Sequence, residues 1–574
     1  MSMTGEISPS DAIAPHPWLA SYPAAVDWHT VYSPRPLFAL LDDAAAQFGA
    51  RPCTCFEGRT LTYTEVAALV NNTAAGLQRL GVTKGTKVGL FLPNSPTFII
   101  YYYAVLKAGG TIVNYNPLYT IEELAFQIKD SETRLMVTLD LKLLFDKVER
   151  LLEGGELQQV IVASFASLLP AYKSPLFKLL KFRDRAWPAS SKNRSKIVLE
   201  CEMLAGHPTF RPATIDPLKD LAVLQYTGGT TGTPKGAMLT HANVYTNTLQ
   251  VVAWAPELIQ AQERVLGVLP FFHVFAMTVV MNFGIAKAAE IIIMPRFKLD
   301  DALKLIHKRR PTIMPGVPTL FSAIANHPKV KDFTLTSLNF CLSGGAPLLL
   351  ETKQSFERAT GCTLIEGYGL SETSPVVTCN PLKGPPKLGS IGLPLPATLI
   401  TLRDPADPMR EVAPGERGEI CVQGPQVMLG YWNKPAETTQ QFAGPHLRTG
   451  DVGTMDQDGF FYIVDRIKDL IISKGYNVYP RRIEEAISSH PSVDEVVVIG
   501  IPDAERGEAP KAFIKLRPGM EASAADILRH LEPKLAKMEH PSEIEFRDHL
   551  PKTMIGKLSK KELKAEEARK RAGG

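Results

Sequence analysis

Apolar residues recur along the first third of the chain with two periods, one typical of short strands and one of amphipathic helices. Strand-like runs occupy Cys53–Phe56, Thr60–Thr62, Lys87–Leu92, Thr111–Asn114 and Leu135–Thr138. Helical periods occupy Leu37–Phe48, Thr97–Lys107 and Thr120–Lys129, the last opened by a capping-box pair, Thr120 and Glu123. Strands and helices that alternate with short loops predict a parallel sheet covered by helices.

The pattern changes after the middle of the chain. His241–Trp254 has a helical period, whereas Gly415–Glu419 and Gly430–Trp432 indicate tight turns of a β-rich subdomain. From Leu470 the last ~105 residues alternate again, with a helix over Arg482–Ser489 and a strand over Val496–Ile499. We therefore expect an α/β protein with a large N-terminal domain of doubly wound layers, a β-rich subdomain and a small, mobile α+β C-terminal domain.

One uncharged stretch, Val265–Ala286, has about the length of a membrane span. Pro270, His273 and Asn282 interrupt it, and Pro270 would break a helix near its start. A buried strand, a turn at Pro270 and a buried helix explain the stretch better than a membrane span.

Composition narrows the class of protein. At 574 residues the chain is long enough for two or more domains, and a net charge of +4 is too weak to suggest a nucleic-acid surface. Seven scattered cysteines fit reduced thiols in the cytoplasm better than a disulfide framework, and Cys53 and Cys55 fit a strand better than a zinc site. The first residues lack the basic and apolar regions of a secretory signal. Residues 1–35 predict an irregular arm on the surface, and the tail from Leu558 predicts a frayed helix.

Residues 164–196 form a basic amphipathic segment. Leu176, Leu179 and Leu180 can share one helical face, while Lys178 and Lys181 lie on another. Such a segment can rest on an anionic membrane surface. It can equally be a solvated insertion whose leucines pack against the body of the protein. The sequence leaves both interpretations open.

The stretch Tyr226–Gly236 combines four glycines, four threonines and one lysine after apolar Leu221–Leu224. Glycines let backbone N–H groups approach an anion closely, threonine hydroxyls add donors, and Lys235 can place a charge on a phosphate. The stretch is not a Walker A motif, because Lys235 follows Pro234 instead of a glycine. We interpret it as a loop that binds the phosphates of a nucleotide.

Further motifs carry candidate chemistry. In Glu366–Thr373 a tyrosine between glycines, Tyr368, offers an open ring face, and Glu372 offers a hard oxygen ligand for magnesium. Leu269–Met277 places aromatic residues on both sides of His273. The remaining motifs are Val317–Phe321, Ser343–Pro347, Arg448–Asp451, Asp465–Asp469, Ser473–Pro480 and Pro551–Lys557.

Together these motifs resemble the adenylate-forming superfamily, which contains acyl-CoA synthetases, luciferase and peptide-synthetase adenylation domains. The resemblance spans roughly Pro36 to Leu563, is closest to long-chain fatty-acid–CoA ligases, and has six motifs in the family order. It implies an adenylate-forming domain over 36–465 with an insertion at 164–196, a hinge at 466–469 and a small domain at 470–574.

The resemblance also implies roles for individual residues, with ATP and coenzyme A as co-substrates and Mg²⁺ as cofactor. The catalytic candidates are Lys557, His273 and Lys235. The ATP-binding candidates are Thr227, Gly228, Gly229, Thr230, Thr231, Gly232, Lys235, Gly345, Ala346, Glu366, Gly367, Tyr368, Gly369, Asp451 and Arg466. Thr227 and Glu372 would hold the metal, Phe275, Met277 and Val317 would line the acyl pocket, Lys474 and Gly475 would bind coenzyme A, and Lys468 would be the hinge.

The expected activity is activation of a fatty acid, most similar to a long-chain one, to an acyl-adenylate and then to a coenzyme A thioester. Met277 stands where fatty-acid members can carry an aromatic gate, so an aryl or medium-chain acid stays open. Three further functions would share this fold: an acyl-adenylate-binding uptake scaffold with weak catalysis, a peptide-synthetase module and a luciferase-type oxidase. We expect a cytoplasmic protein with small-molecule substrates and no nucleic-acid partner; peripheral contact with the cytoplasmic membrane face and a homodimer stay open.

Overall fold

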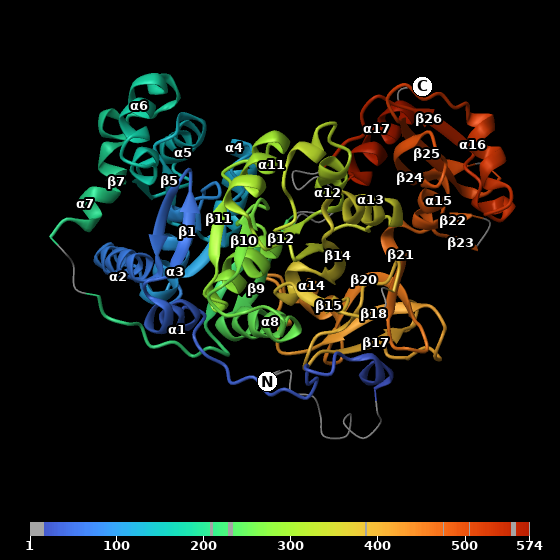
Figure 1. Ribbon diagram of the computed structural model, residues 1–574, viewed down its shortest axis with the longest axis horizontal. Helices are drawn as coiled ribbons and strands as arrows, with labels where there is room; N and C mark the ends of the chain where they lie inside the picture. Colours follow the sequence, from blue (N-terminus) through green and yellow to red (C-terminus); the bar gives the residue numbers. More distant parts are fainter. Residues whose placement is uncertain are drawn as a thin grey trace.

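The computed structural model describes residues 16–206, 210–227, 234–384, 387–473, 476–503, 505–552 and 558–572. Within these ranges the strands form four sheets, two in the body of the large domain, one in a β-rich subdomain and one in the small C-terminal domain (Figure 1). The predicted division into a large α/β domain and a small C-terminal domain is therefore confirmed.

The first sheet has seven strands in the order β7-β6-β5-β3-β4-β8-β9. Every neighbouring pair in this sheet is parallel except β8 and β9. The crossover from β3 to both neighbours gives the doubly wound topology that the sequence predicts. Its strands are β3 (Lys87–Leu90), β4 (Thr111–Asn114), β5 (Leu135–Leu139), β6 (Gln159–Ala163), β7 (Ile197–Leu199), β8 (Leu221–Thr227) and β9 (Lys235–Thr240).

The second sheet has nine strands in the order β16-β15-β14-β13-β12-β10-β11-β1-β2. Its central strands run parallel, and antiparallel pairs lie at both ends. The strands are β1 (Pro52–Phe56), β2 (Arg59–Thr62), β10 (Arg264–Gly267), β11 (Glu290–Ile293), β12 (Ile313–Gly316), β13 (Phe340–Ser343), β14 (Thr363–Gly369), β15 (Val376–Cys379) and β16 (Leu393–Pro394).

Helices cover both sheets and separate them. In α3 every residue is buried, as expected for a helix that is apolar on all sides. The predicted capping box at α4 is present, since Thr120 accepts from the Glu123 N–H and Glu123 accepts from the Thr120 N–H. The helices of the large domain are α1 (Ala39–Phe48), α2 (Tyr63–Arg79), α3 (Pro96–Ala108), α4 (Ile121–Ser131), α5 (Lys142–Gly154), α6 (Lys173–Leu180), α7 (Glu200–Leu204), α8 (His241–Trp254), α9 (Val274–Ala276), α10 (Phe283–Ala286), α11 (Leu299–Arg309), α12 (Pro318–Ala325), α13 (Leu350–Thr360) and α14 (Pro435–Gln441).

The uncharged stretch Val265–Ala286 forms β10, a turn and a buried helical segment, as predicted. Residues Met277–Asn282 between α9 and α10 are π-helical, a geometry that often marks functional sites. None of the helices in the described part of the chain has the length and apolarity needed to cross a membrane. All seven cysteines are free thiols, and Cys53 and Cys55 lie in β1.

The β-rich subdomain comprises β17 (Leu399–Arg403), β18 (Gly418–Gln423), β19 (Phe442–Ala443), β20 (His446–Met455) and β21 (Phe461–Arg466). The N-terminal arm packs against it, with Trp18 and Trp28 almost fully buried beside Phe461. Over residues 16–35 the predicted irregular arm is thus anchored by two tryptophans that are buried in a core.

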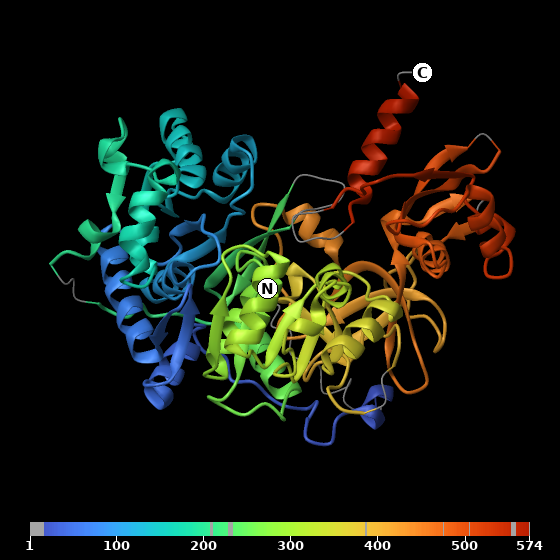
Figure 2. The ribbon, with the colours of Figure 1, turned by 45° about the horizontal axis from the view of Figure 1, so that its top comes forward.

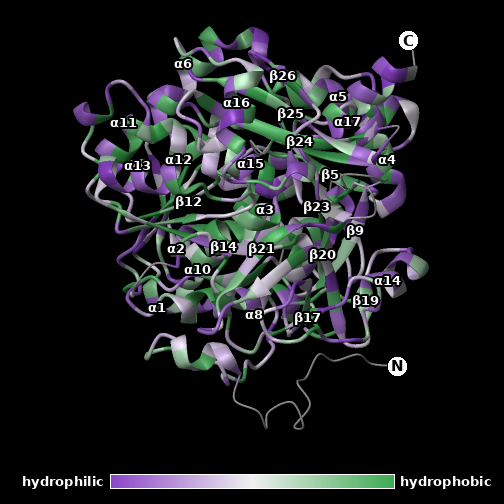
Figure 3. Cartoon of the chain, turned by 90° about the vertical axis from the view of Figure 1, so that its right-hand side faces the viewer, coloured by the Kyte–Doolittle hydropathy of each residue, from purple (hydrophilic) through white to green (hydrophobic). Residues whose placement is uncertain are grey.

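The small domain has a sheet in the order β23-β22-β25-β24, with β26 added beside β25. Its long strands β24 and β25 are coloured green for hydrophobic in Figure 3, whereas α13 of the large domain is largely purple for hydrophilic. The elements are β22 (Ile471–Ser473), β23 (Tyr476–Val478), α15 (Pro480–Ser488), β24 (Val493–Asp503), β25 (Gly507–Leu516), α16 (Ala524–Leu531), β26 (Glu543–Phe546) and α17 (Lys560–Ala572).

The helix α6 lies at the end of the large domain opposite the small domain in both views (Figures 1 and 2). Its leucines do not pack on the body: Leu176, Leu179 and Leu180 are 54%, 72% and 67% exposed. The ring of Phe177 instead packs against the large hydrophobic core, and its centroid lies 5.0 Å from that of Phe165 in the same segment. The expectation that Leu176, Leu179 and Leu180 pack against the body is therefore wrong.

Candidate active site

Three parallel strands of the nine-stranded sheet end in register at one edge. Gly316 of β12 is paired with Ser343 of β13, and Ser343 with Glu366 of β14. Four of the predicted motifs begin or end here: Val317–Phe321, Ser343–Pro347, Glu366–Thr373 and, through the contact of Phe275 with Gly344, Leu269–Met277. The carboxyl edge of parallel strands is where α/β proteins bind ligands.

At two positions in these motifs, the space around the backbone explains why the residue is glycine. Gly345 has φ = +82°, a left-handed conformation that side chains disfavour. A Cβ at Gly369 would lie 1.9 Å from the Pro375 carbonyl oxygen, so a larger residue would push β14 away from the following chain. The predicted site residue Gly369 is thus required sterically, Gly367 lies in the same strand β14, and Ala346 follows Gly345 in the turn.

The predicted phosphate loop connects two antiparallel strands. Thr227 at the end of β8 is paired with Lys235 at the start of β9, so both flank the mouth of the hairpin. Residues 228–233, including the predicted Gly228, Gly229, Thr230, Thr231 and Gly232, lie outside the described residues. The base of the hairpin is fixed by Tyr226, whose hydroxyl donates to Asp130 at 2.5 Å.

Lys235 and Glu372 meet around a residue that the motifs did not single out. Tyr431 donates its hydroxyl proton to Glu372 Oε1 at 2.7 Å, and Lys235 Nζ lies 4.8 Å from the centroid of its ring. Burial and the neighbouring Glu372 raise the pKa of Tyr431, which therefore remains a donor at neutral pH. Tyr431 orients the carboxylate and contacts the cation at once.

The segment that carries Tyr431 runs beside the hairpin. Tyr431 pairs with Ala237 of β9, and the Trp432 N–H donates to the Gly236 carbonyl at 2.8 Å. The sequence suggested only a turn of the β-rich subdomain here. Tyr431 and Glu372 are 59 residues apart in the sequence, so the motifs could not connect them. The only local indication of a role for Tyr431 was its position between Gly430 and Trp432.

The donor set suits magnesium carried by a nucleotide. Among the described residues no group of three or more His, Cys, Asp or Glu side chains could hold a metal by itself. Magnesium commonly takes one or two carboxylates together with substrate phosphates and water. Glu372, beside the hairpin mouth with the Thr227 hydroxyl, can supply such a protein ligand.

A second cluster centres on Asp451 in β20. Its Oδ2 accepts from the Tyr368 hydroxyl at 2.7 Å, and its Oδ1 lies 2.9 Å from Arg466 Nε. Asp451 is only 2% exposed, so the arginine compensates the charge of a buried carboxylate. A carboxylate offers about four acceptor positions, so two remain for hydroxyl groups of a ligand.

Glu366 is buried beside the same strand end. The Leu348 N–H donates to its Oε1 at 3.2 Å, and the Asn380 N–H donates to its carbonyl at 3.0 Å. Burial raises the pKa of its carboxyl to about 7, although Arg481 of the small domain opposes this effect. Glu366 therefore titrates near neutral pH.

The Leu269–Met277 segment reaches the site through Phe275. A Cβ at Gly344 would lie 3.0 Å from Phe275 Cζ, so the ring packs directly on the glycine turn. His273 Nδ1 accepts from the Phe275 N–H at 3.3 Å and caps α9. Met277 is fully buried, with Asn114 Nδ2 3.6 Å from its sulfur.

An apolar cavity of about 30 Å³ lies behind this segment. Its walls come from α8, the π-helical stretch, α10 and strands β12 to β15, and they include Trp254, Val279, Phe283, Phe340, Leu342 and Ile365. Val279 and Phe283 follow Phe275 by four and eight residues, whereas Phe275, Met277 and Val317 are not among the lining residues. The volume is about that of one water molecule, so a longer guest requires side chains to move.

The predicted hinge residue Lys468 lies in a short 3-10 helix, Ile467–Asp469, between β21 and β22. Lys474, Gly475 and Lys557 lie outside the described residues. Among the described residues, the structure thus brings Lys235 and Glu372 together around Tyr431, and Tyr368 and Arg466 together around Asp451.

Comparison with known proteins agrees with this geometry. A family model described as AMP-binding enzyme matches residues 41–432. The chain belongs to the AMP-binding enzyme family. A second model, AMP-binding enzyme C-terminal domain, matches residues 482–557 of this AMP-binding enzyme, within the small domain.

Relatives of this AMP-binding enzyme extend over nearly its whole length. It is 42% identical to a long-chain-fatty-acid–CoA ligase of Bacillus subtilis, covering 96% of this chain and 98% of the relative. It is 36% identical to the protein of the same name from Salmonella typhimurium, with the same coverage. Among solved structures, ATP-bound MatB from Rhodopseudomonas palustris has a TM-score of 0.80 at 29% identity, covering 93% of this chain and 99% of that one.

Tyr431→Phe tests the cluster of Lys235, Tyr431 and Glu372 in this AMP-binding enzyme. Loss of a hydrogen bond to a charged group costs about 1.5–3 kcal/mol, so ATP-dependent adenylate formation should fall roughly 10- to 100-fold and need more Mg²⁺. Pyrophosphate exchange at several Mg²⁺ concentrations measures this. Tyr462→Phe in β21, which removes a 3.0 Å hydrogen bond to Asp456, is the matched control. Equal losses in both variants would contradict the role of Tyr431.

Glu366→Gln tests the buried carboxyl. With a folded pKa of about 7 above an ordinary 4.5, the stabilising effect of the neutral form is complete below pH 4.5 and is lost as pH rises through 7. The glutamine variant should therefore gain stability over the wild type between pH 5 and pH 8, by about 2–3 kcal/mol. Denaturant unfolding at both pH values measures it, with exposed Glu122→Gln as control. A difference that does not change with pH would contradict the raised pKa.

Proposed function

We propose that this chain activates fatty acids, joining a carboxylic acid to coenzyme A with ATP converted to AMP and pyrophosphate. The observation that carries the proposal is the placement of the Lys235–Tyr431–Glu372 and Tyr368–Asp451–Arg466 clusters beside the strand ends where Phe275 packs. Full-length similarity to long-chain-fatty-acid–CoA ligases supports the same activity.

The reaction needs two steps because a carboxylate is a poor electrophile. In the first step a carboxylate oxygen attacks the α-phosphorus of ATP, and pyrophosphate leaves. In the second step the coenzyme A thiolate attacks the acyl carbon, and AMP leaves with the electron pair of the broken C–O bond. The protein contributes positioning and charge stabilisation.

The residues that the motifs point to divide these tasks. Thr227 and Lys235 hold the β- and γ-phosphates, and Tyr368 flanks the adenine. Asp451, fixed by Tyr368 and Arg466, accepts from the ribose hydroxyls. Lys557, from the small domain, bridges the substrate carboxylate and the α-phosphate in the first step only.

Magnesium, when bound, neutralises phosphate charge as pyrophosphate forms. Glu372 would hold it with the hydroxyl of Thr227, and Tyr431 keeps the Glu372 carboxylate oriented by its hydrogen bond. Lys474 and Gly475 would face coenzyme A after the small domain has turned about Lys468.

A panel of acids from acetate to oleate, with 4-coumarate included, tests the substrate class. Wild-type enzyme should release AMP in an ATP- and coenzyme A-dependent reaction, with kcat/KM rising toward long chains. A preference for 4-coumarate would favour an aryl substrate, since a probable 4-coumarate–CoA ligase from Dictyostelium discoideum is 34% identical over 87% of this chain. Binding of acyl-adenylate without turnover would favour the scaffold.

The apolar cavity is the site we propose for the acyl chain, once the side chains that line it have moved. Val279→Phe should fill part of the cavity and shift the preference of the enzyme to acids with shorter chains. Activity on short acids should fall little, because the added ring excludes only the longer chains. Met277→Phe is the matched substitution beside Asn114. If Met277→Phe shortens the profile and Val279→Phe does not, the chain runs past Asn114 instead.

A peripheral site of action also fits this substrate. Six large apolar side chains in and beside α6 are more than half exposed: Tyr172, Leu176, Leu179, Leu180, Phe182 and Trp187. Residues 173–196 hold eight Lys or Arg and one acid, Asp184. Apolar side chains ringed by cations match an anionic lipid surface. The free cysteines fit the cytoplasmic face of that membrane.

Leu179→Ser with Leu180→Ser should reduce binding to vesicles of phosphatidylglycerol and phosphatidylcholine at least ~10-fold, since each leucine buries apolar area in the lipid. Binding of the wild type should weaken with salt. Leu349→Ser with Leu350→Ser, which are 39% and 45% exposed at the start of α13, is the control. Equal binding by both double variants in vesicle sedimentation would exclude the α6 surface.

A further inference from the structure

The segment that joins the two domains carries a charge at each end. Arg466 ends β21 of the β-rich subdomain, and Asp469 ends the short 3-10 helix that leads to β22. Arg466 Nε lies 2.9 Å from Asp451 Oδ1, and the two residues are also paired in β20 and β21. The first end of the segment is thus held by the large domain.

The other end is held by the small domain. Lys564 Nζ in α17 donates to Asp469 Oδ1 at 3.0 Å. Lys560, one turn earlier in α17, pairs with Glu484 of α15 at 2.9 Å and lies close enough to Asp469 to act on its charge. Burial alone would raise the pKa of Asp469, but Lys560 and Lys564 outweigh it and lower the pKa. Asp469 is therefore ionised at neutral pH.

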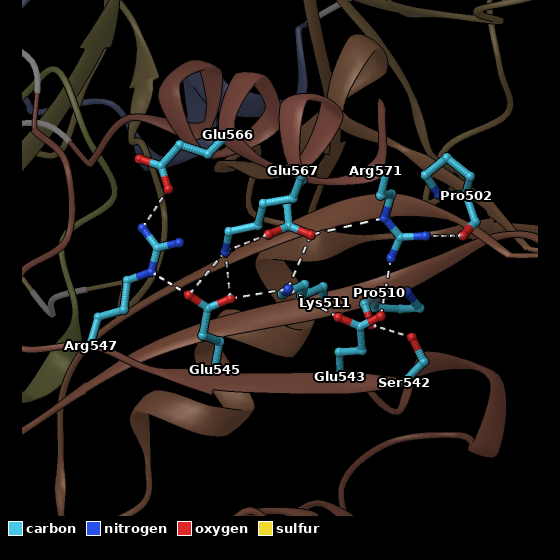
Figure 4. A network of polar contacts seen from close by, with 11 residues as sticks. Pro502, Pro510, Lys511, Ser542, Glu543, Glu545, Arg547, Glu566, Glu567 and Arg571 are labelled. Atoms are coloured by element: carbon cyan, nitrogen blue, oxygen red, sulfur yellow. Dashed lines mark hydrogen bonds and ion pairs between the residues drawn. The ribbon is translucent and has the colours of Figure 1, made fainter. Parts of the chain in front are cut away.

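The helix α17 is itself firmly attached to the small domain. The ammonium group of Lys511 in β25 lies between Glu543 and Glu545 of β26 and Glu567 of α17, at 3.0, 3.1 and 3.1 Å (Figure 4). Leu563 is fully buried against β24 and β25. The expectation of a frayed C-terminal helix is wrong for the described residues 558–572, because ion pairs and a buried leucine fix it.

We infer that Lys564 is a positioning residue which binds the far end of the hinge to the small domain, so that the turn between domains is confined to Ile467 and Lys468. This inference rests on the proposed two-step function. A swing that changes few backbone angles ends in two defined orientations. Lys564 follows Lys557 by seven residues, so the chain after the proposed catalytic lysine is tied directly to the hinge.

Lys564→Met removes the charge and keeps a long side chain. Without the contact to Lys564, the backbone at Asp469 and beyond can also change when the domains rotate. The hinge segment 466–469 should therefore open more often and become a better protease substrate. We expect trypsin to cut after Arg466 or Lys468 at least ~5-fold faster, since cleavage follows local opening. Lys564→Arg should restore the wild-type rate, and Asp469→Asn should behave like Lys564→Met. The double variant should add nothing, as expected for one shared interaction.

Kinetics provides the second measurement. Turnover to the thioester should fall roughly 5- to 20-fold in Lys564→Met with the KM for ATP within about 2-fold, because the nucleotide site is intact and the alternation of domains is impaired. Lys570→Met, which removes an α17 lysine paired with Glu545 and Glu567 instead of the hinge, is the matched control.

The inference is overturned if Lys564→Met and Lys570→Met are alike in cleavage at 466–468 and in turnover, or if the arginine variant fails to rescue. Cleavage needs no substrate. A wild type that activates no acid would therefore refute the proposed function, while the protease comparison would still decide the role of Lys564.

Discussion

The buried carboxylate of Asp451 links the parts of this protein that must act together. Asp451 belongs to the β-rich subdomain. It accepts a hydrogen bond from Tyr368 at the carboxyl edge of the nine-stranded sheet, and it forms an ion pair with Arg466 at the start of the hinge. An unpaired charge in this position would cost several kcal/mol, and both partners compensate that charge. The β-rich subdomain, the sheet edge and the start of the hinge therefore meet at one charged group.

Local patterns in the sequence were sufficient for much of the fold. The capping box at Thr120, the strand-turn-helix interpretation of Val265–Ala286 and the alternation of strands and helices are all confirmed, because each depends on residues close together in the chain. The packing of the arm was not foreseen. Trp28 donates to the Thr398 carbonyl across 370 residues, and nothing near Trp28 indicates that partner.

The candidate site shows the same limit. Glycine-rich and acidic motifs pointed to Lys235, Tyr368, Glu372 and Asp451, whose chemistry is evident from residue type. The role of Tyr431 was not predicted, because its partners come from β9 and from the segment after β14, which are distant in the sequence. The exposed leucines of α6 also needed the fold, since amphipathic spacing alone does not tell whether an apolar face meets protein or solvent.

The N-terminal arm decides which parts of the protein are stationary. Tyr22 donates to the Pro394 carbonyl in β16, the last strand of the nine-stranded sheet, while Trp18 contacts Phe461 in the β-rich subdomain. The arm thus bridges the two and fastens the subdomain to the body of the large domain. In the proposed rotation of the small domain, the residues proposed to bind the nucleotide in the large domain would therefore keep their relative positions, and only the chain beyond the hinge would move past them.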